Sequence, residues 1–363
     1  MLTVRSNSCN LSIYFTELLQ ETNLSNSGNS KSKVVALLSG GLDSSLAVLL
    51  MCRQDVEVHA IVYMTHFGCH IAEDKSGCSH DPFPMAEKYG FDVKMCHLGE
   101  KYIEIVKNPK FGHGKNMNPC VDCRIMMLNE AKYVMERIGA DAIVTGEVLG
   151  QRPMSQTRDR LFQVEKETGL KGRLLRPLSA KLMDPTVPEL EGKIDRDRLE
   201  GISGRSRRRQ MELAEELGLE EYPNATSGCL LTDPNFSRRL KDLFTHTPDA
   251  GYSEINLLKV GRHFRYSADT KIIVGRNESD NDQIEALKSR ADIQLEAKDT
   301  GSPITLLQGM PTDDAVEFAA RITARYCDDK RARSVPITMS YRDREEVVEV
   351  APLEDSVLKK IRL

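Results

Sequence analysis

The sequence lacks a long hydrophobic run, a strong net charge and a secretion signal. No apolar run approaches the roughly 18 residues that a bilayer span needs, so no membrane segment is expected. A net charge of −4 excludes a global basic field, and any contact with nucleic acid has to come from local patches. The amino end shows no basic-then-apolar pattern, which favours the cytoplasm, where thiols stay reduced. The absence of tryptophan excludes nothing.

The chain is long enough for two or three domains, at 363 residues. Residues 1–33 include a run rich in serine, asparagine and glycine, and we expect a flexible leader there. Over residues 34–245 short apolar strands alternate with helices, which predicts an α/β domain with a parallel sheet. Residues 255–363 have a different pattern that indicates a smaller α+β domain. Nine cysteines, an odd number, favour buried thiols, metal ligands or redox chemistry over a disulfide framework.

The most informative segment is the run Ser39-Gly40-Gly41-Leu42-Asp43-Ser44, which stands between an apolar strand and an apolar helix. Adjacent glycines let the backbone turn tightly, and the amides at the start of the helix point toward a bound anion. Asp43 is placed to hold a Mg²⁺ ion that bridges phosphates. The Gly-x4-Gly-Lys-Ser/Thr spacing of the ordinary P-loop is lacking, so γ-phosphate chemistry is not expected. The alternative is a glycine turn in some other strand–helix unit.

Three cysteines form a second candidate site. Cys120 and Cys123 are spaced C-x2-C before a predicted helix over 124–138, where two sulfurs can meet one ion and the helix dipole lowers the thiol pKa. Cys229 follows in a Ser-Gly-Cys turn. Three thiolates leave one coordination position open, which suits a 4Fe–4S cluster. A persulfide carrier with a resolving thiol, a zinc site and inert cysteines are the alternatives.

Further polar groups follow other predicted elements. Gly146 and Glu147 follow a predicted strand over 142–145, with Gln151 close behind, and parallel strands end at one edge of a sheet. A metal site or, as we favour, a polar loop is predicted for His66, Cys69, His70, Cys78 and His80. An RNA-binding patch or a solvated helix face is predicted for Arg205, Arg207, Arg208 and Arg209. Further basic runs with a pattern suited to tracking a phosphate backbone and stacking a base are Arg238, Arg239 and Lys241, and then Lys259, Arg262, His263 and Arg265 around Phe264 and Tyr266.

These segments resemble known enzymes. The Ser39–Ser44 run resembles the PP-loop of the ATP pyrophosphatases, which split ATP between the α- and β-phosphates and activate a carbonyl oxygen as its adenylate. Asn118-Pro119-Cys120-x-x-Cys123 resembles a loop of tRNA 2-thiouridylases. Thr145–Gln151 and the later Ser155-Gln156-Thr157 are similar to a stretch of tRNA 4-thiouridine synthases. The three-cysteine set is similar to that of the cluster-dependent tRNA thiolases.

The resemblance implies that residues 34–245 are a PP-loop ATP pyrophosphatase domain of an ATP-dependent tRNA sulfurtransferase. It implies ATP, Mg²⁺ and a 4Fe–4S cluster as cofactors, and tRNA and a sulfur donor, either sulfide or a persulfide-carrying desulfurase, as partners. Nucleotide binding is expected of Ser39, Gly40, Gly41, Leu42, Ser44, Gly146, Glu147 and Gln151. Catalysis is expected of Asp43, Cys123 and Cys229, with Mg²⁺ on Asp43 and the cluster on Cys120, Cys123 and Cys229.

The C-terminal domain carries its own resemblance. The run from Ile272 to Asp282, followed by Gly301-Ser302-Pro303, resembles the RNA-binding module of the NFACT proteins. An oligomerisation unit is the alternative, and a homodimer is left open. Two other functions also stay open: an RNA-binding adaptor that only senses nucleotide, and a PP-loop enzyme that acts on a small molecule. Nothing resembles the leader domains of 4-thiouridine synthases, so the target nucleotide is left open.

Overall fold

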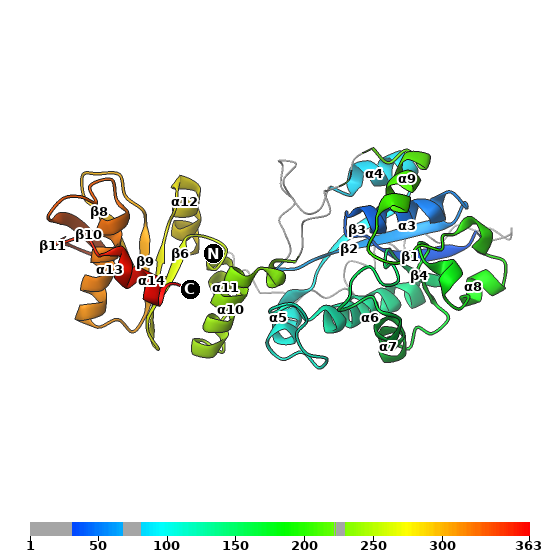
Figure 1. Ribbon diagram of the computed structural model, residues 1–363, viewed down its shortest axis with the longest axis horizontal. Helices are drawn as coiled ribbons and strands as arrows, with labels where there is room; N and C mark the ends of the chain where they lie inside the picture. Colours follow the sequence, from blue (N-terminus) through cyan, green and yellow to red (C-terminus); the bar gives the residue numbers. More distant parts are fainter. Residues whose placement is uncertain (1–30, 68–80, 221, 223–228) are drawn as a thin grey trace, which may run out of the picture. The chain divides into compact units, whose positions relative to one another are not determined.

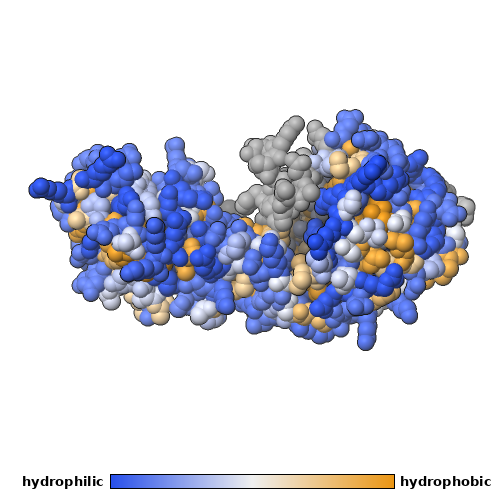
Figure 2. Space-filling model, in the orientation of Figure 1, coloured by the Kyte–Doolittle hydropathy of each residue, from blue (hydrophilic) through white to orange (hydrophobic). Residues whose placement is uncertain are grey.

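The computed structural model describes residues 31–67, 81–220, 222 and 229–363. The chain divides between Leu230 and Leu231 into an N-terminal and a C-terminal unit (Figure 1). Most of the predicted leader therefore lies outside the described residues. No helix within the described ranges is long and apolar enough to cross a membrane. Hydrophilic residues cover most of the face of each unit that Figure 2 shows.

The N-terminal unit is built on a five-stranded parallel sheet with the strand order β3-β2-β1-β4-β5. Its strands are β1 (Lys33–Leu37), β2 (Glu57–Met64), β3 (Asp92–His97), β4 (Ala142–Thr145) and β5 (Leu174–Leu175). Val34, Val35 and Ala36 of the central strand are fully buried, because helices cover both faces of the sheet. The predicted α/β fold with a parallel sheet is confirmed.

Helices of this unit form two layers (Figure 1). They are α3 (Leu42–Cys52), α4 (Phe83–Tyr89), α5 (Gly99–Lys107), α6 (Cys120–Ile138), α7 (Arg158–Thr168), α8 (Val187–Leu190) and α9 (Arg208–Glu216), with short 3-10 turns at Ala180–Leu182 and Arg196–Arg198. Leu46 of α3 and Leu213 of α9 pack against the face that carries Val34. Leu128 of α6 and Val164 of α7 cover the opposite face. Apolar positions at helical spacing therefore hold each layer to the sheet.

The order of the strands reverses direction between β1 and β4. From β1 the chain moves outward through β2 and β3, and then returns to place β4 on the other side of β1. The loops after β1 and β4 therefore leave the sheet in opposite directions. In parallel α/β sheets such a switch point, at the carboxyl ends of the strands, is where ligands bind. The glycine turn follows β1 and the Gly146-Glu147 pair follows β4.

The C-terminal unit is an antiparallel six-stranded sheet with the order β11-β10-β8-β9-β7-β6. Its strands are β6 (Arg262–Ser267), β7 (Thr270–Val274), β8 (Ile293–Ala297), β9 (Thr305–Gly309), β10 (Val335–Tyr341) and β11 (Arg344–Val350). Its helices are α10 (Pro234–His246), α11 (Tyr252–Leu257), α12 (Glu278–Leu287), α13 (Asp313–Tyr326) and α14 (Asp355–Ile361), after a 3-10 turn at Leu230–Thr232. Helix α10 groups with this unit, whereas the sequence placed residues up to 245 in the first domain.

Helices cover both faces of this second sheet as well. Ile272 and Val274 of β7 pack with α13 and α14, whereas Ile273, between them, packs with Leu257 of α11 and Ile284 of α12. Alternate residues of one strand therefore enter separate cores, as the pleat of a strand requires.

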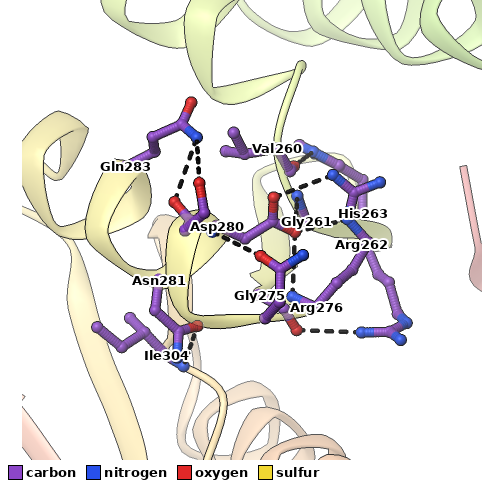
Figure 3. A network of polar contacts seen from close by, with 12 residues as sticks. Val260, Gly261, Arg262, His263, Gly275, Arg276, Asp280, Asn281, Gln283 and Ile304 are labelled. Atoms are coloured by element: carbon purple, nitrogen blue, oxygen red, sulfur yellow. Dashed lines mark hydrogen bonds and ion pairs between the residues drawn. The ribbon is translucent and has the colours of Figure 1, made fainter. Parts of the chain in front are cut away.

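A polar network braces the turn between β7 and α12 (Figure 3). The Asp280 carboxylate accepts hydrogen bonds from the backbone N–H groups of Gly261 and Arg276, each at 3.1 Å, and pairs with the Arg276 guanidinium at 2.5 Å. The Asn281 side chain accepts a hydrogen bond from the backbone N–H of Ile304 at 3.0 Å. A Cβ on Gly275 would lie 2.0 Å from the Asn281 oxygen. The run from Ile272 to Asp282 therefore serves to hold three segments of the unit together.

Candidate active site

The glycine turn after β1 is closed by its own hydroxyls. Gly40 has a φ of 70°, a left-handed conformation that disfavours any residue with a Cβ. Ser44 Oγ accepts a hydrogen bond from the Ser39 amide at 3.1 Å and donates to the Gly41 carbonyl at 2.9 Å. Gly41 precedes α3 with an extended backbone, and Leu42, the first residue of α3, is buried. The turn is thus set by its own hydrogen bonds, and the first amides of α3 have no partner within the helix.

Asp43 lies in the first turn of α3 and has one carboxylate oxygen to spare. Its Oδ2 accepts a hydrogen bond from Gln151 Nε2 at 2.7 Å and lies 3.7 Å from Arg207 Nη2. Its Oδ1 is buried and has no hydrogen-bond partner. Gln210, which is fully buried, donates to Gln151 at 3.1 Å and so fixes the amide that orients Asp43. A buried carboxylate oxygen without a donor is suited to meet a cation.

The end of β4 touches the glycine turn. A Cβ on Gly146 would lie 2.4 Å from the backbone nitrogen of Ser44 and 2.5 Å from the carbonyl carbon of Asp43. Since these are backbone atoms at the start of a helix, they have no side-chain freedom with which to yield. Only glycine permits this approach, and the approach makes the loops after β1 and β4 one site.

Glu147 is buried beside the site and is fully engaged. Its carboxylate lies 3.1 Å from Arg176 Nε and 3.2 Å from Arg124 Nε, and it accepts a hydrogen bond from the Thr145 hydroxyl at 3.2 Å. Burial alone would raise the pKa of Glu147, but the charges of Arg124 and Arg176 outweigh it and hold the pKa below its usual value. Arg176 also pairs with Glu165 of α7. Glu147 therefore ties β4 to α6 and α7.

The three cysteines face one phenol. Tyr102 of α5 hydrogen-bonds the Cys123 thiol, and its pKa is raised first by burial and then by its closeness to Cys123, Cys229 and Cys120. Cys229 Sγ lies 3.6 Å from the carbonyl oxygen of Phe67, which follows β2. Helix α6 begins at Cys120, so both cysteines of the C-x2-C pair lie in its first turn. Phe67 in turn lies 5.9 Å from the Tyr102 ring between centroids, so Tyr102 has near it thiols that are about a hundred residues apart in the sequence.

The thiols differ from expectation in their acidity. Burial raises the pKa of Cys123 to about 11, and burial also raises the pKa of Cys120 in spite of the nearby Arg152 and Arg124. The expected lowering by the helix start is wrong here, because desolvation of a thiolate outweighs it. Both thiols therefore carry their protons at neutral pH until a cation or a base removes them.

The two groups of residues that the sequence suggested as metal ligands can be compared with the structure. Across the parts of the chain that the structure describes, no three His, Cys, Asp or Glu side chains are grouped to hold a metal ion. Of the second predicted set, Cys69, His70, Cys78 and His80 lie outside the described residues. The remaining member, His66, packs edge-on against His97 with ring centroids 4.3 Å apart.

One loop serves both the glycine turn and the thiols. Within the loop over 146–156, Gln151 reaches Asp43, as described, and Ser155 hydrogen-bonds the Cys120 sulfur. The loop is closed by a backbone hydrogen bond of 2.7 Å between Gly150 and Gln156. A displacement of this loop would therefore move the partner of Asp43 and the partner of Cys120 together.

The arginine run of α9 serves two purposes. Arg208 pairs with Glu212, and Arg209 pairs with Glu200 and Glu216, as expected for a solvated helix face. Arg207 instead points to Asp43. No local pattern separates these neighbours, and no site role is predicted from the sequence for Tyr102, Arg124, Arg176 or Gln210. A helix start that faces the site would have been the only available signal for Arg207.

Two family models match separate parts of the chain. Residues 29–183 match the thiamine biosynthesis protein (ThiI) family, and residues 261–362 match the NFACT protein RNA binding domain. The two resemblances drawn from the sequence are thereby confirmed. Neither match includes Cys229 or α9.

Curated relatives and solved structures are similar over part of their length. A probable tRNA sulfurtransferase of Thermococcus kodakarensis is 33% identical over 156 residues, which is 40% of this chain and 36% of the relative. One of Lysinibacillus sphaericus is 31% identical over 194 residues, 53% of this chain and 40% of the relative. The chain thus spans less than half the length of these relatives. A 4-thiouridine synthetase in complex with RNA and ATP is 21% identical over 52% of each chain, with a TM-score of 0.34.

Proposed function

From the match of residues 29–183 to the ThiI family, we propose that this chain is an ATP-dependent tRNA sulfurtransferase. It would replace a uridine carbonyl oxygen by sulfur and form AMP and pyrophosphate. The observation that carries the proposal is the loop over 146–156, which contacts Asp43 through Gln151 and Cys120 through Ser155. This loop links the anion-binding turn to the thiols. A carbonyl oxygen activated at the turn would therefore lie near the groups that deliver sulfur.

ATP is proposed to bind at the switch point between β1 and β4. The amides from Gly40 to Leu42 and the hydroxyls of Ser39 and Ser44 would hold the diphosphate that leaves as pyrophosphate. Asp43 Oδ1, buried and unpartnered, is the atom for Mg²⁺, which when bound neutralises phosphate charge. Arg207 adds a guanidinium at the same place.

The chemistry then has two displacements. In the first, the uridine carbonyl oxygen attacks the α-phosphorus of ATP, and pyrophosphate leaves. In the second, a sulfur nucleophile attacks the activated carbon, and AMP leaves with the oxygen. Adenylation turns a poor leaving group into a good one, and the uridine has to leave its stack to be reached. Glu147, through Arg124 and Arg176, holds the site in place without touching the reacting atoms.

Sulfur delivery is proposed for the thiols that face Tyr102. Cys120, Cys123 and Cys229 would hold a 4Fe–4S cluster, which when bound would supply sulfide. Within the described ranges the side chains of these cysteines do not surround a common point. The alternative is a persulfide on Cys123 or Cys229, and both routes require that the Cys123 thiol, whose pKa burial raises to about 11, lose its proton.

Substitution of Asp43 tests the activation step. With unmodified tRNA, sulfide and reduced cluster reagents under anaerobic conditions, Asp43→Ala should lower AMP release and thiolated nucleoside by about 100-fold or more. The matched control is Asp159→Asn, an exposed aspartate in the first turn of α7, which should keep activity. Unchanged AMP formation by Asp43→Ala would refute the proposal. AMP release that needs no RNA would point to a small-molecule substrate, and tRNA binding without thiolation would point to an adaptor.

Anaerobic purification tests the thiol set. We expect a visible iron–sulfur chromophore with iron and sulfide, which Cys120→Ala, Cys123→Ala and Cys229→Ala should each remove. Cys52→Ala serves as the control, since Cys52 ends α3. A colourless, iron-free protein that still thiolates tRNA would favour the persulfide alternative.

A further inference from the structure

We propose that five arginines of the C-terminal unit form a binding site for the phosphodiester backbone of RNA, and this inference rests on the proposed function. We call them the arginine cluster. They come from four separate segments of the unit: Arg238 and Arg239 of α10, Arg262 of β6, Arg276 before α12, and Arg362 after α14. Arg238 and Arg239 lie outside the residues that match the NFACT RNA binding domain, so that match does not assign them.

Short contacts hold two of these side chains in place. Arg239 Nη1 donates to the Leu258 carbonyl at 3.0 Å, whereas its Nε is buried without a partner. Arg262 Nη1 donates to the Gly275 carbonyl at 3.0 Å, and its guanidinium lies 4.5 Å from the centroid of the Tyr326 ring. Both guanidiniums are therefore positioned by the fold and keep donor groups that these contacts do not use.

The arginines lie close enough to repel one another: Arg362 forms an isolated antiparallel bridge with Phe264 of β6, and Arg262 reaches the carbonyl of Gly275, the residue before Arg276. Burial lowers the pKa of Arg239, and the charges of Arg276, Arg362 and Arg238 lower it further. Burial also lowers the pKa of Arg262, with further lowering by Arg362 and Arg276. Charges that are partly desolvated and face like charges destabilise the folded unit until an anion joins them.

Carboxylates balance this charge only in part: Asp233 acts to raise the pKa of Arg239 and Asp280 that of Arg262, but burial and the neighbouring arginines outweigh them. Arg276 pairs with Asp280, as Figure 3 shows, but that carboxylate is already used by the backbone of the turn. Among the residues that the structure describes, no carboxylate lies within ion-pair distance of Arg238, Arg239, Arg262 or Arg362. By contrast, Arg265 of the same strand β6 has a close partner in Asp242. The cluster is thus a local excess of positive charge in a chain whose net charge is −4.

The chemistry of the cluster favours a phosphate backbone over a single anion. A guanidinium fork binds phosphate oxygens through paired hydrogen bonds. Four segments that each present an arginine provide several contact points, which suits a chain of phosphates and gives no base-specific readout. The experiment should therefore measure salt dependence, because each neutralised phosphate releases counterions and steepens it.

The test uses the full chain, the double variant Arg239→Gln/Arg362→Gln and a labelled unmodified tRNA transcript. Binding is measured by fluorescence anisotropy between about 50 and 200 mM salt, a range in which counterion release is large, about tenfold or more for several contacts. We expect the slope of log affinity against log salt to fall by about 1 for each arginine removed. Arg331→Gln, an exposed arginine of the same unit, is the matched control and should keep the slope.

Further measurements distinguish a loss of RNA binding from misfolding and from a failure of the proposed function. Arg362→Gln alone replaces an exposed side chain and should lower the slope without changing the melting temperature. ATP binding by calorimetry should be unchanged in all variants. If tRNA is thiolated while the double variant keeps the wild-type slope, the cluster is not the RNA site and the proposed function stands. If the double variant loses affinity but wild-type protein never thiolates tRNA, the proposed function fails and the RNA site stands.

Discussion

The two units use runs of small and polar residues in opposite ways. In the N-terminal unit the Ser39–Ser44 run leaves free amides and an unpartnered Asp43 oxygen at the edge of a parallel sheet. In the C-terminal unit the run from Ile272 to Asp282 uses its polar groups internally, with Asp280 and Asn281 bound to nearby backbone. Its proposed ligand groups are instead arginines from four separate segments of the unit. A polar motif is thus a site or a brace according to which of its groups are left without partners.

Removal of a buried charge should have the largest effect, and in the N-terminal unit. Glu147→Gln leaves Arg124 and Arg176 without their shared counter-charge, and we expect a loss of about 3–5 kcal/mol in the free energy of unfolding. The matched change in the other unit is Asp280→Asn, whose partner Arg276 is 47% exposed, so we expect at most about 2 kcal/mol. Urea unfolding followed by hydrogen exchange of each unit measures both. Equal losses would show that the two networks brace their units alike.

Two glycine substitutions, one in each unit, should have smaller effects on stability and test the same contrast between the units. Gly146→Ala places a methyl group 2.4 Å from a backbone nitrogen in α3, and we expect about 1–3 kcal/mol of destabilisation together with loss of ATP binding. Gly275→Ala meets the side chain of Asn281, so the double change Gly275→Ala/Asn281→Ala should recover part of the loss. Calorimetry of ATP binding and thermal unfolding test these expectations. ATP binding by Gly146→Ala at wild-type affinity would contradict the close approach of β4 to the turn.

Local patterns predicted the fold of the N-terminal unit well. The alternation of apolar strands and helices indicated the parallel sheet, and β4 was predicted residue for residue. The start of α6 was missed by four residues, because the proline before Cys120 and the short polar residues after it have no apolar spacing. Helices α7 and α12 were missed because charged residues dominate them.

The site was predictable only where its residues adjoin in the sequence. The glycine turn and the C-x2-C pair carry their chemistry in their spacing. Tyr102, Arg176 and Gln210 join the site through tertiary packing, and no local pattern marks them. The acidity of Cys123 was mispredicted for the same reason, since burial is a property of the fold and not of the motif.

A pH-dependent prediction concerns the C-terminal unit alone. Lys271 of β7 is 5% exposed, and burial lowers its pKa to about 7 despite the nearby Asp242. Between pH 7 and the ordinary lysine value the unfolded chain binds the extra proton, so stability rises with pH by up to about 1.4 kcal/mol per unit. Lys271→Met should therefore stabilise the unit more at about pH 7 than at about pH 9.5, as urea unfolding would show. A stabilisation that does not vary with pH would contradict the lowered pKa.

The smallest effect on stability should come from a pair of neighbouring arginines. Arg208 is 88% exposed and pairs with Glu212 one helical turn away, so Arg208→Gln should change the free energy of unfolding by only about 0.3–0.5 kcal/mol and leave ATP binding intact. Arg207→Gln should be equally mild toward unfolding, but it removes the guanidinium that lies 3.7 Å from Asp43. We therefore expect weaker ATP binding for Arg207→Gln alone, measured by calorimetry with both variants side by side. If the two variants bind ATP equally well, Arg207 belongs with Arg208 to the solvated face of α9 and takes no part in the nucleotide site.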